Sequence, residues 1–144
     1  MAKTITAANA IIIFSVAGLQ VSTAQLQGFS ADDIFTTEDQ QRIEALMGVD
    51  GKLSGGKVNN PVVQNYALQA DSDSNDFFDD WNLAEVVAED VYYANALVTL
   101  ISIGKQWTCT KGVLSRFKPL PDAAKVLQPR RYTVTWEKVV PQNI

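Results

Sequence analysis

The sequence predicts a mainly β fold, an antiparallel β-sandwich or partly closed barrel with one flanking α-helix at about residues 74–89. Three observations lead to this prediction. Apolar runs bounded by turn signals recur along the chain, as short strands do. Only residues 74–89 carry a convincing helical periodicity. The chain has 144 residues, 47% of them hydrophobic, which suits a single domain over residues 1–144 with a buried core.

The first strand is expected at Ala10–Val16, AIIIFSV, where a continuous apolar run suits a strand covered on both faces. A second extended segment is expected over residues 23–35, with a bulge at Gly28. The chain should return as a strand over residues 62–70. The one lysine of the N-terminal segment, Lys3, and its short apolar run imitate a secretory signal only weakly. No signal peptide and no transmembrane segment are therefore predicted.

Residues 36–61 are polar and glycine-rich, and they are predicted to protrude from the domain as a hairpin or loop region. Asp50-Gly51 within them is a strong two-residue hairpin signal. The first half of the region is ambiguous, because TTEDQQRIEALMG also matches a short helix with a capping box and a glycine stop. Both interpretations stay open on the sequence alone.

The predicted helix has two distinct sides. A rotation of about 100° per residue gathers one set of apolar side chains on the side that should face the core. That set is Phe77, Trp81, Ala84, Val87, Ala88 and Val91. Leu83 and Val86 fall among acidic residues on the opposite side, where we expect them to need a partner.

The last third of the chain predicts strands over residues 91–103 and 106–117, joined by a turn at Gly104-Lys105. A proline-marked connection leads to a final strand over residues 130–140. Alternation within that strand turns three large residues inward, namely Tyr132, Val134 and Trp136. These strands complete the expected antiparallel fold.

Charge is sorted along the chain. Residues 71–90 carry eight carboxylates and no Lys or Arg, whereas residues 91–144 carry eight basic residues and two acidic ones. A solvated helix face is the plainer explanation of the acidic stretch. The alternative is that acidic and basic surfaces attract one another, within a subunit or between copies. The residues predicted at a subunit interface are Asp76, Asp79, Leu83, Val86, Asp90, Lys118, Arg130 and Arg131.

Enzymatic chemistry is not expected. The chain has no histidine, and its one cysteine, Cys109, suits a small buried apolar residue. The acidic neighbours Asp79 and Asp80, like Asp32 and Asp33, do not point at one another on a helix or strand. No catalytic, metal-binding or cofactor-binding residue is predicted. The net charge of −4 also argues against sequence-specific nucleic-acid binding.

The stretch MGVDGKLSGGKVNNPVVQNYALQADSDSNDFFDDW resembles the tail tube proteins of contractile and long-tailed bacteriophages. The shared features are a Gly-x-Asp-Gly hairpin, a strand that alternates into LQADS, and a Ser-x-x-Asn helix start, met here by Ser72 and Asn75. The segments GFSADDIF and QPRRYTVTWEKV extend the resemblance over most of the chain.

The resemblance implies a tail-tube-like sandwich. Six copies would form a ring with a continuous inner β-barrel, and stacked rings would conduct viral DNA without sequence-specific binding. Asp50, Gly51 and Lys52 would belong to a ring-stacking loop. Implied partners are copies of the chain, tail sheath or outer tail proteins, baseplate and tail terminator proteins, and a tape-measure protein in the lumen before ejection. The implied location is the virion tail, after assembly in the host cytoplasm, and no cofactor is implied.

Two alternatives remain beside this reading. One is another ring-forming tail component, such as a tail terminator, a baseplate hub or a tube of the type VI secretion kind. The other is a monomeric β-sandwich that binds carbohydrate by stacking on Trp81, Trp107 and Trp136. The positions of these tryptophans favour core packing instead.

Overall fold

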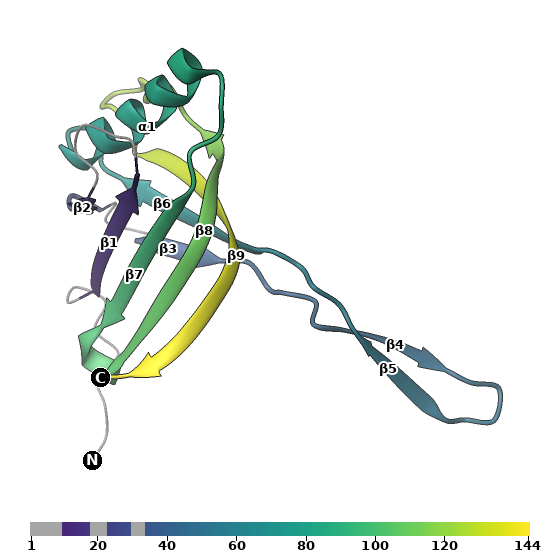
Figure 1. The fold of residues 1–144 in the computed structure, drawn as a ribbon. Coiled ribbons are helices and arrows are strands. Elements are labelled where there is room, and N and C mark those ends of the chain that lie inside the picture. Colours follow the sequence, from purple (N-terminus) through teal and green to yellow (C-terminus); the bar gives the residue numbers. More distant parts are fainter. Residues whose placement is uncertain (1–9, 18–22, 30–33) are drawn as a thin grey trace.

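The computed structural model describes residues 10–17, 23–29 and 34–144. Within them, seven strands form one antiparallel sheet in the order β2-β1-β7-β8-β9-β6-β3, and β4 pairs with β5 in a separate two-stranded sheet (Figure 1). The strands are β1 Ala10–Val16, β2 Thr23–Gln25, β3 Phe35–Thr37, β4 Ile43–Met47, β5 Leu53–Lys57, β6 Val62–Leu68, β7 Ala94–Leu100, β8 Lys105–Phe117 and β9 Arg130–Asn143. Helix α1 spans Ser74–Ala88, and a 3-10 turn, η1, spans Ile101–Ile103. The predicted mainly β antiparallel fold with one flanking helix is confirmed, and the sheet does not close into a barrel.

The sheet curls so that its two ends face one another across an aromatic core. The ring of Phe14, on β1, lies 5.3 Å from that of Tyr66, on β6, and 5.7 Å from that of Trp136, on β9. Helix α1 adds Phe78 and Trp81, whose rings lie 5.8 and 6.4 Å from Phe14. Because Phe14 touches all three elements, the core lies between the curled sheet and the helix.

A buried glutamine holds two aromatic residues of this core in place. The Gln64 side-chain carbonyl accepts hydrogen bonds from the Tyr66 hydroxyl and, at 2.9 Å, from the Trp136 indole N–H. Its amide group donates to the Thr37 hydroxyl at 3.1 Å. Burial raises the pKa of Tyr66 well above its usual range, so this hydroxyl remains a donor. The cluster thus satisfies polar groups that burial would otherwise penalise.

A second buried amide ties the start of α1 to the sheet. The Tyr132 hydroxyl, on β9, donates to Asn75 Oδ1 at 2.8 Å, and Asn75 Nδ2 donates to the Gln69 carbonyl at 2.9 Å. Asn75 is the asparagine of the Ser-x-x-Asn helix start. Its position is explained by this bridge between α1, β9 and the end of β6.

Changing Tyr132 to phenylalanine is expected to lower the free energy of unfolding by about 1 to 2 kcal/mol, because Asn75 Oδ1 then lacks its buried donor. Urea unfolding followed by far-ultraviolet circular dichroism measures the change. Tyr93→Phe is the control, since Tyr93 is exposed, and it should change stability by less than about 0.5 kcal/mol. Equal effects from both changes would contradict the role given to Asn75.

Two expectations about the strands need correction. Strand β1 alternates, with Ile12 and Phe14 buried and Ile11 and Ile13 half-buried, so it is covered on one face only. Residues 23–35 are not one strand, because β2 and β3 lie at opposite borders of the sheet.

Among the other predicted elements, one alternative is wrong and three features are confirmed. The helical alternative for the first half of residues 36–61 is wrong, since β4 is a strand paired to β5. The predicted strands over residues 62–70 and 106–117 are confirmed as β6 and β8. The turn at Gly104 is confirmed with φ +68°, a backbone angle that favours glycine.

Cys109 is buried as expected, with no exposed surface. Burial raises the pKa of its thiol to about 11, so the thiolate is scarce at neutral pH. The residue therefore behaves as a small apolar core residue.

Candidate assembly surfaces

Arg130, at the start of β9, fastens the acidic helix to the sheet. Its guanidinium group donates to both carboxylate oxygens of Asp79, at 2.8 and 3.2 Å, and twice to the Lys118 carbonyl, at 2.8 and 3.1 Å. The Arg130 side chain is 6% exposed and that of Asp79 is 43% exposed. Donation of these hydrogen bonds to the Asp79 carboxylate raises the pKa of Arg130. Part of the sorted charge therefore meets within one subunit, and the interface role predicted for these two residues stays a prediction.

The other predicted interface residues lie on the surface, where their proposed role remains a prediction. Lys118 forms an ion pair with Asp122 at 2.7 Å. The Asp90 carboxylate accepts a hydrogen bond from the Val91 N–H at 2.7 Å. Exposed without a role in the core are Asp76, Leu83, Val86 and Arg131.

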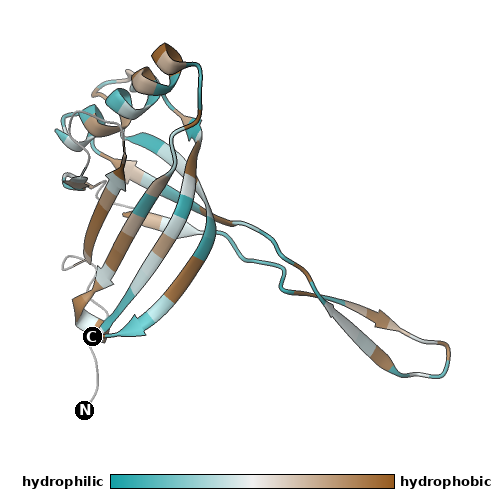
Figure 2. Ribbon diagram, viewed as in Figure 1, coloured by the Kyte–Doolittle hydropathy of each residue, from teal (hydrophilic) through white to brown (hydrophobic). Residues whose placement is uncertain are grey.

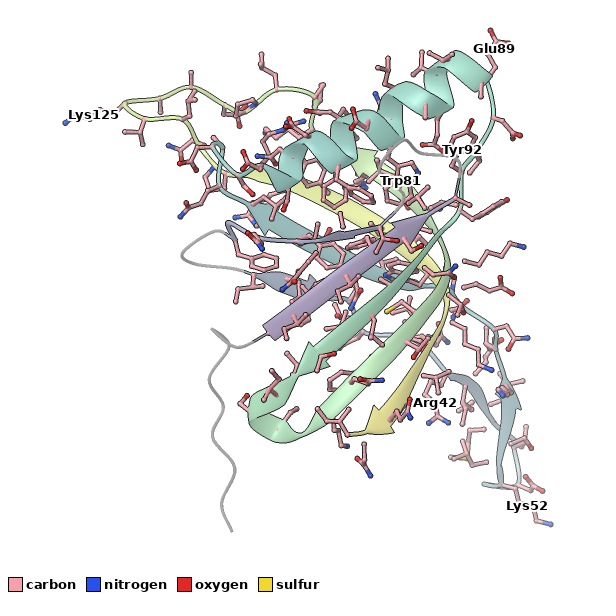
Figure 3. The ribbon with its side chains drawn as sticks, turned by 60° about the vertical axis from the view of Figure 1, so that its left-hand side comes forward. Arg42, Lys52, Trp81, Glu89, Tyr92 and Lys125 are labelled. Atoms are coloured by element: carbon pink, nitrogen blue, oxygen red, sulfur yellow. The ribbon has the colours of Figure 1, made fainter. Side chains whose placement is uncertain are left out.

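The second half of α1 does not pack against the sheet. Phe77, Phe78 and Trp81 are buried, but Val87 is 77% exposed and Val91 is 48% exposed. The prediction that Val87, Ala88 and Val91 face the core was therefore wrong. Figure 3 shows the reason, since the end of the helix near Glu89 extends past the sheet.

The β4–β5 hairpin forms an arm, defined here as residues 38–60, that points away from the main sheet (Figure 1). Every residue of both strands is exposed. At the root of the arm, the Val58 N–H donates to the Arg42 carbonyl and the Asn60 side chain donates to the Gln41 carbonyl, both at 2.9 Å. The arm is thus an ordered projection that contributes little to the core of its own domain.

The two faces of the arm differ. Residues opposite one another in an antiparallel pair share a face, and the register pairs Met47 with Leu53 and Ala45 with Gly55. The apolar face of the arm therefore comprises Ile43, Ala45, Met47, Leu53 and Gly55, with the charged Lys57 beside Ile43 at the root. The opposite face carries Glu44, Leu46, Ser54 and Gly56. Figure 2 shows hydrophobic residues toward the far end of the arm.

Sequence analysis missed this apolar face. The register of β4 against β5 defines it, and the sequence TTEDQQRIEALMG matched a short helix as well as part of a hairpin. An isolated two-stranded hairpin is marginally stable in water. The exposed apolar face is therefore a candidate surface for contact with another molecule.

The residues predicted to stack rings lie at the tip of the arm. Gly51 has φ +84°, and the Lys52 N–H donates to Asp50 Oδ1 at 3.1 Å. Lys52 points outward at the end of the arm in Figure 3. The hairpin signal at Asp50-Gly51 is confirmed, while the stacking role of these residues stays a prediction.

A groove of about 280 Å³ opens on the concave side of the sheet. It lies toward the end of the sheet that is far from α1, beside the end of β7 and the start of β8 (Figure 1). The apolar side chains that line it are Phe35, Val62, Val98, Leu100, Trp107 and Val139. Trp107 is half-buried in this groove, whereas Trp81 and Trp136 are fully buried.

No group of three His, Cys, Asp or Glu residues that could hold a metal ion occurs in the described part of the chain. Within the same ranges, no helix has the length and apolar character needed to cross a membrane. Asp80 is exposed and Asp79 is engaged by Arg130. Asp32 and Asp33 lie outside the described residues.

A family model described as "Tail fiber protein gp32" matches residues 3–140. The search of curated proteins found no match. Solved structures are similar in fold. One is from the anti-feeding prophage baseplate, with 13% identity and a TM-score of 0.60 over 99% of this chain and 98% of that one. Another is from the sheath-tube complex of an extracellular contractile injection system, with 11% identity and a TM-score of 0.58 over 92% and 88%.

A further solved structure comes from the cap that terminates the anti-feeding prophage tube. It has 8% identity and a TM-score of 0.62 over 100% of this chain and 94% of that one. At such identities the likeness concerns the fold alone. The curled sheet, the flanking helix and nearly the whole length of the chain are therefore shared with these proteins.

Proposed function

The chain belongs to the tail fiber protein gp32 family, and from this premise we propose that its copies form hexameric rings stacked as a tail tube for viral DNA. Family membership gives the chain a structural, tail-related role. The finer assignment is supported by the likeness of its fold to a chain of a sheath-tube complex. It agrees with the tail tube resemblance of the sequence.

The observation that carries the proposal is the arm. A projecting hairpin with an uncovered apolar face suits a protein that works as a polymer, because a neighbouring copy can cover that face. An arm that binds a different part of the neighbouring subunit makes a heterologous contact. Heterologous contacts generate rings or filaments.

The proposal includes the surroundings of such a tube. DNA passes through the lumen without sequence-specific binding, and a tape-measure protein occupies it before ejection. Sheath or outer tail proteins, baseplate proteins and a tail terminator contact the tube. The subunit is not an enzyme, and it is located in the virion tail after assembly in the host cytoplasm.

Removing the arm tests the proposal. Because Arg42 and Val58 are already hydrogen-bonded partners, residues 43–57 can be replaced by an Asn-Gly turn that closes a short hairpin. We expect the full chain to form rings and tubes in negative-stain micrographs and the shortened chain to remain monomeric. The shortened chain should keep its circular dichroism spectrum and its cooperative unfolding. If the shortened chain forms the same polymers as the full chain, the arm is not needed for assembly and the argument from the arm is refuted.

A tail terminator is the second candidate, favoured by the likeness to the tube-terminating cap. Micrographs of the full chain separate the two candidates, since a terminator forms single rings and a tube subunit forms long stacks. A carbohydrate-binding monomer loses two of its three supporting tryptophans, because the fully buried Trp81 and Trp136 cannot stack on a sugar.

A further inference from the structure

We propose that Asp50, at the tip of the arm, is a site of spontaneous covalent modification, where the aspartate converts to isoaspartate through a succinimide. The reaction needs only water and the turn itself, so this inference stands apart from the proposed function. The observation behind it is the way in which the turn holds the Asp50 carboxyl group beside the peptide bond to Gly51.

The turn folds the Asp50 side chain back over the main chain. Asp50 Oδ1 accepts a hydrogen bond from the Lys52 N–H at 3.1 Å, and a Cβ atom at position 48 would lie 2.7 Å from the same oxygen. An aspartate that bonds the amide two residues on closes a ring of atoms, and this ring contains the nitrogen of the residue between them. The carboxyl carbon of Asp50 and the nitrogen of Gly51 are therefore members of one small ring.

The nitrogen of Gly51 has no side chain to screen it. Gly51 has φ +84°, a backbone angle that favours glycine, and a Cβ atom at this position would meet nothing within 4 Å. Asp50-Gly51 is also the one Asp-Gly pair of the sequence. Asp50 is thus the aspartate whose following nitrogen is least shielded.

One hydrogen bond opposes the reaction. The Gly51 N–H donates to the Gly48 carbonyl at 3.0 Å, and the nitrogen must leave this carbonyl before it attacks. The tip can open while the domain stays folded, because every residue of β4 and β5 is exposed and an isolated hairpin is marginally stable. We therefore expect the conversion in the folded protein.

Water balances the two steps of the conversion. The Gly51 nitrogen loses its proton and bonds to Asp50 Cγ, and the hydroxyl of the carboxylic acid leaves with a proton as water. Water then adds to one of the two carbonyl carbons of the succinimide. Addition at Cγ restores aspartate. Addition at the main-chain carbonyl carbon breaks its bond to the Gly51 nitrogen, so that the chain runs through the side chain of residue 50 and a main-chain carboxylate is left free.

The product changes the turn but not the core. Isoaspartate adds a methylene group to the main chain between Gly48 and Lys52, whose N–H and carbonyl are joined at 2.8 Å. Loop length sets the register of a hairpin, so the longer turn should weaken the pairing of Met47 with Leu53. The buried aromatic residues lie in the main domain, away from the arm (Figure 1).

Ageing a dilute solution of the full chain for several weeks at mildly acidic pH tests the proposal. Trypsin cuts after Arg42 and Lys52, which places Asp50 in the peptide 43–52, IEALMGVDGK. We expect this peptide to separate by chromatography into two forms of equal mass, and a succinimide form one water lighter to precede the second. Ageing in water labelled with heavy oxygen should add the label to this peptide, because each succinimide takes up one water.

The internal control is Asp73, which is followed by Ser74 at the start of α1. We expect roughly tenfold more isoaspartate at Asp50 than at Asp73, because glycine lacks the side chain that screens the nitrogen. The matched variant is Gly51→Asn, since asparagine accepts a positive φ and keeps the turn while its side chain screens the nitrogen. This variant should convert about tenfold more slowly than the native chain, with an unchanged circular dichroism spectrum.

Equal amounts of isoaspartate at Asp50 and Asp73 would overturn the inference, as would a Gly51→Asn chain that converts as fast as the native one. Conversion that occurs only in urea would also overturn it, because the reaction is assigned to the folded protein. None of these readouts depends on polymers, so their failure would leave the proposed function standing.

Discussion

Replacing Gly112 by alanine is expected to lower the free energy of unfolding by about 4 kcal/mol, and to abolish folding if the native protein is only marginally stable. Gly112 on β8 lies directly opposite Trp136 on β9. A Cβ atom at position 112 would lie 2.3 Å from Cε3 of that indole. The fully buried Trp136 would have to move, and its 2.9 Å hydrogen bond to Gln64 would break. The closely packed core offers no room for this shift.

The control for Gly112 is Gly56→Ala in the arm. A Cβ atom there meets nothing within 4 Å, so the change should be neutral or stabilising by up to about 1 kcal/mol, because alanine restricts the unfolded chain. Both changes are measured by urea unfolding with tryptophan fluorescence. Equal stability of the Gly112 variant and the native protein would show that Trp136 is free to move.

Replacing Asp79 by alanine is expected to lower the free energy of unfolding by about 3 kcal/mol. The change leaves the guanidinium of Arg130, which is 6% exposed, without its carboxylate partner. An unpaired buried charge costs more than the ion pair itself contributes. Because Asp79 is itself 43% exposed, water reaches part of the site and keeps the loss at the lower end of the range for buried pairs.

Asp80→Ala is the control for Asp79, since Asp80 is the exposed neighbour on the same helix, and it should cost less than about 0.5 kcal/mol. The double variant Asp79→Ala with Arg130→Met should lose less than the sum of the two single losses, because the two side chains interact directly. Additive losses in thermal or urea unfolding would mean that the ion pair does not hold the helix to the sheet.

Features set by neighbouring residues could be predicted from the sequence. Alternation predicted that Tyr132, Val134 and Trp136 face the core, and all three are buried. Asp50-Gly51 predicted the hairpin, because the geometry of a turn depends on the residues within it. The helix at about residues 74–89 is observed at Ser74–Ala88, since its periodicity and its start are both local.

Features set by distant residues could not be predicted. A helical projection placed Val87 and Val91 toward the core, but it contains no information about where the sheet ends. The separation of β2 from β3 depends on their partners β1 and β6. Which strands pair depends on contacts throughout the folded domain, and not on the sequence of β2 or β3 alone.

The candidate assembly surfaces show the same division. The sorted charge left open whether acidic and basic segments meet within or between subunits, and the structure shows one such pair within the subunit. Asp79 and Arg130 are 51 residues apart, and only the folded sheet brings them together. Likewise, the groove is lined by residues from five strands, β3, β6, β7, β8 and β9, so it exists only after folding.

The unclosed sheet has a mechanical consequence. Backbone hydrogen bonds join the two ends of the sheet only at the bridge of Phe29 with Leu68 among the described residues, so much of the spacing between β1 and β6 is set by aromatic side chains, with Phe14 against Tyr66 and Trp136. The Phe14 side chain therefore helps to set the distance between the β1 side and the β6 side of the curled sheet. A smaller side chain at this position would let β1 and β6 move closer together. The curvature of the sheet would increase, while the order and pairing of its strands would stay the same.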